Sequence, residues 1–118
     1  MPAKKTFLNE KFLRGLYVAF LEAPPFCDIH MPPVEDVYFY VVDDKTIQGA
    51  AHKSPKHYQL HISRKTLSHH ENVIEVFLHE MVHLHFLYRG YTDHKHDAKF
   101  RRLANKVCDV FHFDKKTF

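Results

Sequence analysis

The apolar residues of the chain are spaced in two different ways, which separate the expected helices from the expected strands. Residues 6–23 repeat apolar side chains at three- and four-residue steps, and Pro24-Pro25 follows directly, so we expect a helix that ends there. Residues 37–43 are aromatic and β-branched and predict a strand. A second strand is expected near residues 46–52, where Gly49 marks a bulge or a close approach of the backbone to a neighbour.

A third strand is indicated over residues 57–63, where polar and apolar side chains alternate. Tyr58, Leu60 and Ile62 would face one side of the sheet, opposite to His57, Gln59 and His61. Short connections favour the pairing of successive strands, so we expect a three-stranded, mostly antiparallel meander. If the third strand borders the functional site, its backbone would pair with an extended peptide.

Two further helices are expected in the second half of the chain. Ser68 and Glu71 form a capping box ahead of a long apolar run, and the helix that it opens extends to about Tyr88, with Gly90 as a stop. Because this run leaves little polar face, we expect the helix to be central and buried. A last helix over residues 97–111 has a single apolar stripe, which completes an α+β fold. Its outer face carries Lys99, Arg101, Arg102 and Lys106.

Composition narrows the class of protein. The 118 residues, 45% hydrophobic and 26% charged, are typical of one globular domain, and we expect residues 1–118 to form it. Cys27 and Cys108 form no CxxC pair, which excludes a zinc ribbon and a disulfide framework; we expect both to be reduced and buried. The chain shows no membrane-spanning run and no signal peptide, so we expect a cytoplasmic monomer, placed at the nucleoid or nucleus if it binds DNA. A formal net charge of +3 permits a nucleic-acid partner without requiring one.

Twelve histidines are an unusually high number, and two of them stand in a motif that carries chemistry. The expected buried helix contains His79-Glu80-Met81-Val82-His83, an HExxH. Residues four apart on a helix lie about 40° apart and one turn along, so both imidazoles can reach one ion, whereas Glu80 lies about 100° round. Glu80 is then placed to hold a water at the metal and take its proton. Because these polar groups would be costly to bury without partners, a zinc site is favoured over a pair of core histidines.

A catalytic zinc site has three protein ligands, so one must come from outside the motif. The downstream candidates are His85, His94, His96, Asp97 and His112. The first of these, two residues past the motif, points to a different face of the helix. Arg89 stands six residues after the second histidine, where another class of zinc protease has its third ligand. The third ligand is therefore expected within residues 91–100, because a turn after Gly90 would return this segment to the motif. Either His94 or His96 in that segment could be the ligand.

Joined to the element after it, the motif resembles that of the SprT-like, or Spartan-type, zinc metalloproteases. Their pattern is an HExxH, a loop, and a His-Gly-x-x-Phe element that opens a helix; here His96-Asp97-Ala98-Lys99-Phe100 follows the loop. The resemblance covers roughly residues 6–111 and implies a zincin-like domain. It makes His79, His83 and His96 the ligands of Zn²⁺, with Phe100 as a packing aromatic. Asp97 replaces the family's glycine, the loop is short, and the C-terminal zinc ribbon of many relatives is missing.

The resemblance also implies an activity and a partner. It implies metal-dependent hydrolysis of peptide bonds with Glu80 as the general base, often in proteins bound or crosslinked to DNA, and hence a role in DNA–protein crosslink repair. Without an accessory module, contact with DNA would rest on the cationic face of the last helix or on a partner.

Other interpretations of the same residues stay open. The chain could be a zinc-stabilised module that binds DNA and a partner without hydrolysis. The segment Tyr91-Thr92-Asp93-His94 is similar to the end of the YbeY-type endoribonuclease motif, so a metal-dependent nuclease is a further alternative. Asp93 or Asp97 either orients a ligating histidine or caps the last helix. Tyr91 or His94 is a candidate for stabilising an oxyanion.

Overall fold

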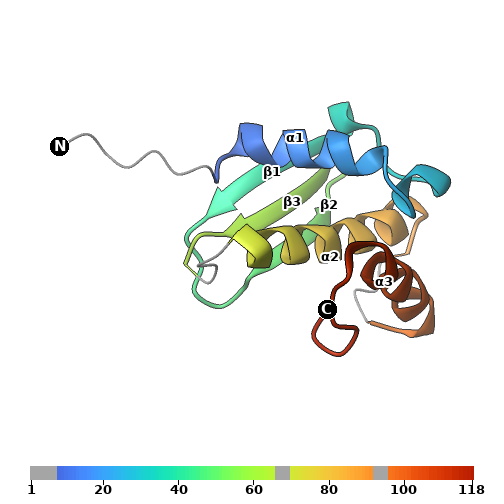
Figure 1. The fold of residues 1–118 in the computed structure, drawn as a ribbon. Helices are drawn as coiled ribbons and strands as arrows, with labels where there is room; N and C mark the ends of the chain where they lie inside the picture. The colour runs from blue at the N-terminus through green and yellow to red at the C-terminus, as the bar shows by residue number, and fades with distance from the viewer. Residues whose placement is uncertain (1–7, 66–69, 92–95) are drawn as a thin grey trace.

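The computed structural model describes residues 8–65, 70–91 and 96–118. Within these ranges it contains three α-helices and three strands, which confirms the expected α+β class. In chain order they are α1 (Glu10–Leu21), β1 (Val37–Val42), β2 (Gly49–Lys53), β3 (Tyr58–Ser63), α2 (His70–Tyr88) and α3 (Ala98–Phe111) (Figure 1). Two single-turn 3₁₀ helices, Phe26–Asp28 and Val34–Asp36, lie between α1 and β1. Among the residues described, no helix is both long and apolar enough to cross a membrane.

A side-chain cap sets the start of α1. The Asn9 side chain accepts a hydrogen bond from the backbone N–H of Phe12 at 2.8 Å, so α1 begins at Glu10. The helix ends at Leu21 and is therefore shorter at both ends than the expected span of residues 6–23. Ser68, which opens the predicted capping box of α2, lies outside the described residues.

The sheet differs from the expected meander. Its strand order is β1-β3-β2, and β3 pairs in parallel with β1 and antiparallel with β2. The pairing of β2 with β3 is confirmed, but the predicted pairing of β1 with β2 is wrong, and the sheet is mixed rather than mostly antiparallel. β3 is therefore the central strand, and β2 forms an edge.

The connection between β1 and β2, residues 43–48, explains this order. Instead of turning tightly, it passes over the end of β3, where the backbone N–H of Ser63 donates to the carbonyl oxygen of Gln48 at 2.9 Å. Because the connection spans one strand position, β3 can insert between its two neighbours. Leu60 and Ile62 of β3 have no exposed surface, so the strand in the central position is the one whose inward side chains are fully buried.

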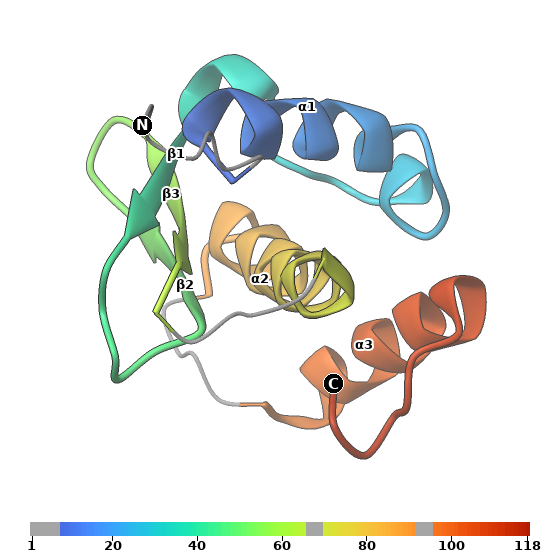
Figure 2. The ribbon, with the colours of Figure 1, turned by 60° about the vertical axis from the view of Figure 1, so that its left-hand side comes forward.

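α2 forms the centre of the core. It packs against the sheet on one side and against α3 on another, while α1 covers β1 (Figure 1, Figure 2). The ring of Phe39 in β1 lies 5.5 Å from that of Tyr17 in α1 and 6.3 Å from that of Phe77 in α2, which joins the three elements on one face of the sheet. Further residues of α2 with no exposed surface are Leu78, Met81, Val82 and Leu84. The expectation of a central, buried helix is confirmed.

The two cysteines lie in different environments. Cys108 is buried on α3, as expected, whereas Cys27 is exposed, which corrects the expectation that both are buried. The 3₁₀ turn at Phe26–Asp28 buries the larger Phe26 and so turns Cys27 to the surface. Both thiols are free, in agreement with the absence of a disulfide framework.

Gly49 is the point where β2 lies directly against α2. A Cβ atom there would be 2.8 Å from Cγ1 of Val76, 3.0 Å from the carbonyl oxygen of His61 and 3.1 Å from Cγ of Glu80. These distances are too short for a methyl group unless its neighbours move. The close backbone approach expected at Gly49 is therefore confirmed, and it brings the edge strand against Glu80.

We expect Gly49→Ala to destabilise the protein by about 1–3 kcal/mol, because the added methyl must displace packed neighbours. Gly15→Ala is the matched control, because nothing lies within 4 Å of a Cβ atom at that position of α1. A glycine inside a helix costs about 0.5–1 kcal/mol relative to alanine, so this variant should be more stable than the wild type. Urea unfolding followed by circular dichroism measures both, and equal changes in the two variants would contradict the tight contact at Gly49.

Candidate metal centre

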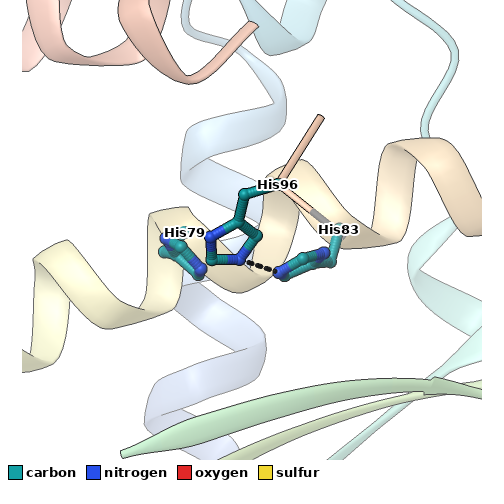
Figure 3. A group of neighbouring side chains, drawn as sticks. All are labelled: His79, His83 and His96. Atoms are coloured by element: carbon teal, nitrogen blue, oxygen red, sulfur yellow. Dashed lines mark hydrogen bonds between the residues drawn. The ribbon is translucent and has the colours of Figure 1, made fainter. Parts of the chain in front are cut away.

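Three histidines from two parts of the chain come together beside α2. His79 and His83 stand one turn apart on α2, and His96 comes from the segment that leads into α3 (Figure 3). The Nε2 atoms of His83 and His96 are 3.1 Å apart, and the ring centroid of His79 lies 5.1 Å from that of His83 and 4.8 Å from that of His96. One ring nitrogen of each histidine lies within 4.8 Å of those of the other two. Within the described residues, these three histidines form a group of potential ligands close enough to share a metal ion.

The donor set fits zinc. Zn–N bonds of 2.0–2.1 Å in a tetrahedron place ligand nitrogens about 3.3 Å apart, so small side-chain rotations would let the three rings share one ion. Three nitrogen ligands leave a fourth position for water or substrate, as in catalytic rather than closed structural zinc sites. His79 and His83 are half-buried and His96 is exposed, so the group is reached from solvent on the side of His96.

Phe100 packs against all three imidazoles. It is buried, and its ring centroid lies 4.4 Å from that of His96, 4.5 Å from that of His83 and 5.2 Å from that of His79. Asp97 caps α3 by accepting a hydrogen bond from the backbone N–H of Phe100 at 3.0 Å. Of the two roles that the sequence leaves open for Asp97, the structure shows the cap. The start of α3 thus presents His96 and Phe100 to the same place.

Burial favours the neutral form of two of these histidines, His79 and His96. Desolvation, together with the nearby His96 and Arg101, lowers the pKa of His79 to about 4. The pKa of His96 is also lowered, by burial and then by the charge of Arg101. A neutral imidazole keeps the lone pair that binds a metal, so the fold holds these side chains in the protonation state that a metal ion requires.

Glu80 lies beside the histidines at a cavity of about 610 Å³. Its side chain is 6% exposed, and burial raises the pKa of its carboxyl to about 8. A cation next to a buried carboxyl favours the charged form, so a bound metal ion would lower that pKa. The cavity is also bordered by Gln48 and Gly49 at the start of β2, by Glu75 of α2 and by Phe118.

The other predicted site residues are not part of this group. Nδ1 of His85 lies 2.6 Å from the carbonyl oxygen of His30 and donates to it. His112 ends α3 in the left-handed conformation, with φ of 63°. Tyr91 is 41% exposed and does not border the cavity. His94, the alternative third ligand, lies outside the described residues, as does Asp93.

Two residues beside the group have roles that local sequence patterns do not reveal. Phe118 borders the cavity, and its ring lies 5.4 Å from that of His79. Arg101 donates to the carbonyl oxygens of Lys115 at 2.8 Å and Phe118 at 3.3 Å, instead of pointing outward with the other cations of α3. Both roles arise because the segment after α3 folds back over the start of that helix.

Comparison with known protein families gives a match over most of the chain. The model of the SprT-like family matches residues 34–117, a range that includes all three strands, α2, α3 and the three histidines. No curated protein matches the chain. The helix α1 precedes the matched range.

Replacing His79, His83 or His96 by alanine is expected to weaken zinc binding by more than about 100-fold, because loss of even an outer partner of a ligand costs up to about that much. Competition with a chromophoric chelator measures the affinity, and elemental analysis after gel filtration gives the stoichiometry. His112→Asn is the control: asparagine tolerates the left-handed backbone, and this variant should hold zinc as the wild type does. Full zinc retention by His96→Ala would contradict the assignment and favour His94.

Proposed function

Because the chain belongs to the SprT-like family, we propose that it is a zinc-dependent metallopeptidase that hydrolyses peptide bonds in proteins. The observation that carries this proposal is that three histidines close enough to share a metal ion stand beside a buried glutamate, and that two of them, His79 and His96, border the same cavity as Glu80. His79, His83 and His96 would hold Zn²⁺, which when bound polarises a carbonyl group and makes water a stronger acid.

Glu80 has the position of a general acid and base. As a carboxylate it takes a proton from the attacking water, and as a carboxylic acid it gives that proton to the amine that leaves. Its side chain shares the cavity with His79 and His96, so water and substrate can meet all three groups. Its burial shields the reacting atoms from bulk water, which strengthens the electrostatic interactions there.

An extended peptide would find a backbone partner at β2. This strand pairs with β3 along one side, and no described strand pairs with its other side. Gly49, at the start of β2, borders the same cavity as Glu80 and packs directly against the Glu80 side chain. A peptide added to this edge as a further strand would run past the histidines. Its backbone carbonyl groups would lie in the plane of the sheet, where they can accept hydrogen bonds from β2. The strand addition considered for residues 57–63 therefore belongs to β2, since β3 is central.

Glu80→Gln should keep one zinc per chain and lose peptide hydrolysis by at least about 100-fold, because the amide keeps the shape of the side chain but cannot take the proton. Cleavage of a protein substrate, with and without DNA, is followed by gel electrophoresis alongside the zinc content. Glu22→Gln, an exposed change at the end of α1, is the control and should cleave normally.

Two outcomes would count against the peptidase mechanism. Undiminished cleavage by Glu80→Gln would remove the proposed proton transfer. A wild-type protein that holds zinc but cleaves no protein under any of these conditions would favour a zinc-stabilised binding module without hydrolysis.

We further propose that the substrates are proteins bound or crosslinked to DNA, and that α3 contacts the DNA. Lys99, Arg102 and Lys106 share one exposed face of α3, because they stand at three- and four-residue steps. The buried stripe of the helix lies on the other side, and Arg101 is engaged by the carbonyl oxygens of the following segment. The proposal therefore rests on three cations rather than on the four that the sequence suggested.

Arg102→Glu combined with Lys106→Glu should weaken the binding of a labelled DNA oligonucleotide by about 10-fold or more at low salt. The slope of log K against log salt should fall by about 0.9 for each phosphate contact that is lost. Lys11→Glu combined with Arg14→Glu on α1 changes the net charge equally and is the control. Fluorescence anisotropy across a salt series measures both, and equal losses in the two variants would show an effect of net charge alone.

A further inference from the structure

Phe118 forms part of the wall of the cavity that the proposed reaction would use. Its side chain is 6% exposed, although residues 114–117 before it are all exposed. It borders the cavity together with His79, Glu80 and His96, and its ring lies 5.4 Å from that of His79. A single buried ring at the end of an exposed segment is thus inserted beside the proposed reacting groups.

The segment Asp114–Phe118 is attached to α3 through side chains. Arg101 donates to the carbonyl oxygens of Lys115 and Phe118, and the ammonium group of Lys115 forms an ion pair with Asp109 at 2.8 Å. The backbone N–H of Phe118 donates to the carbonyl oxygen of Asp114 at 3.1 Å, which closes the segment into a turn of its own. Because these exposed or partly buried polar groups can bond to water instead, the turn can leave as a unit without opening a helix or the sheet, at the cost of exposing the Phe118 ring.

We propose that Phe118 occupies the subsite that receives an aromatic side chain of the substrate next to the scissile bond. The peptide would displace the segment, and its own ring would take the place of the Phe118 ring against His79. The pocket suits a planar ring, since the Phe118 ring contacts two other rings, that of His79 at 5.4 Å and that of Phe113, on which it stacks at 5.8 Å. This inference rests on the proposed peptidase function and adds a side-chain preference and an internal competitor to it.

Competition between the segment and the substrate sets the size of the expected effect. If the closed state is populated about ten times more than the open one, apparent peptide binding is weakened about tenfold. Phe118→Ala should therefore raise kcat/KM about tenfold for a peptide with a central phenylalanine, through a lower KM at an unchanged kcat. A matched peptide with alanine at that position should gain much less, because its methyl group leaves room for the Phe118 ring, so it does not compete with the segment.

A second experiment uses the fact that the chain has no tryptophan. Phe118→Trp, combined with Glu80→Gln to prevent cleavage, places a single tryptophan, excited selectively over the tyrosines, in the pocket of the whole zinc-loaded protein. We expect blue-shifted emission that acrylamide quenches poorly, and then a red shift with strong quenching when the phenylalanine peptide is added. Tyr38→Trp in the same background is the control, because Tyr38 is 50% exposed on the outer face of the sheet and should not respond.

The two arms separate this inference from the proposed function. If calorimetry shows that the peptide saturates the protein while the indole stays protected, Phe118 is a fixed part of the core and the inference is wrong, although the peptidase proposal stands. Equal kcat/KM for wild type and Phe118→Ala on both peptides would overturn it in the same way. If no peptide binds to or is cleaved by either protein, both proposals fall. Where Phe118→Ala proves unfolded by circular dichroism, the fluorescence arm decides.

Discussion

α2 is enclosed by the sheet and by α3 (Figure 2), and within this enclosure Glu80 is buried and His79 is half-buried. Desolvation by this enclosure keeps His79 neutral and raises the pKa of Glu80. Phe100 closes the contact between α2 and α3 by packing on the three imidazoles, so α3 cannot shift without moving His96 away from the other two. The packing that holds the fold together therefore also sets the geometry and the protonation of the proposed metal centre.

The walls of the cavity beside this centre differ in how firmly they are held in place. On one side, Gly49 brings β2 against Glu80, and its contacts leave no space for even a methyl group. On another side stands Phe118, whose segment is attached by polar contacts that are exposed or partly buried. A tightly packed wall can hold a peptide backbone in register with the histidines, whereas a loosely attached wall can control which side chains enter. Positioning and selection would thus be divided between different parts of the chain.

The accuracy of sequence-based prediction here depends on whether the information lies within one element. The HExxH spacing and the apolar run of α2 are properties of a single helix, and the structure has both His79 and His83 on that helix facing His96. The strand order could not be predicted in this way, because it depends on how residues 43–48 pass over the end of β3, which alternation within a strand does not encode. The positions of Cys27 and Phe118 were inaccessible for a related reason, since each depends on a short segment folding against a distant element.

Among the described residues, no strand pairs with the outer edge of β2, and this edge also affects how copies of the chain meet each other. An unpaired strand edge accepts a second molecule of the same protein as readily as a substrate, and natural sheets limit this by keeping such edges short and charged. β2 has five residues, begins with glycine and ends with Lys53, so it offers few hydrogen bonds to a stacking neighbour. A peptide anchored at the histidines as well would gain a second attachment that another copy of β2 lacks. The shortness of this strand therefore protects the protein against aggregation while leaving the edge usable for chemistry.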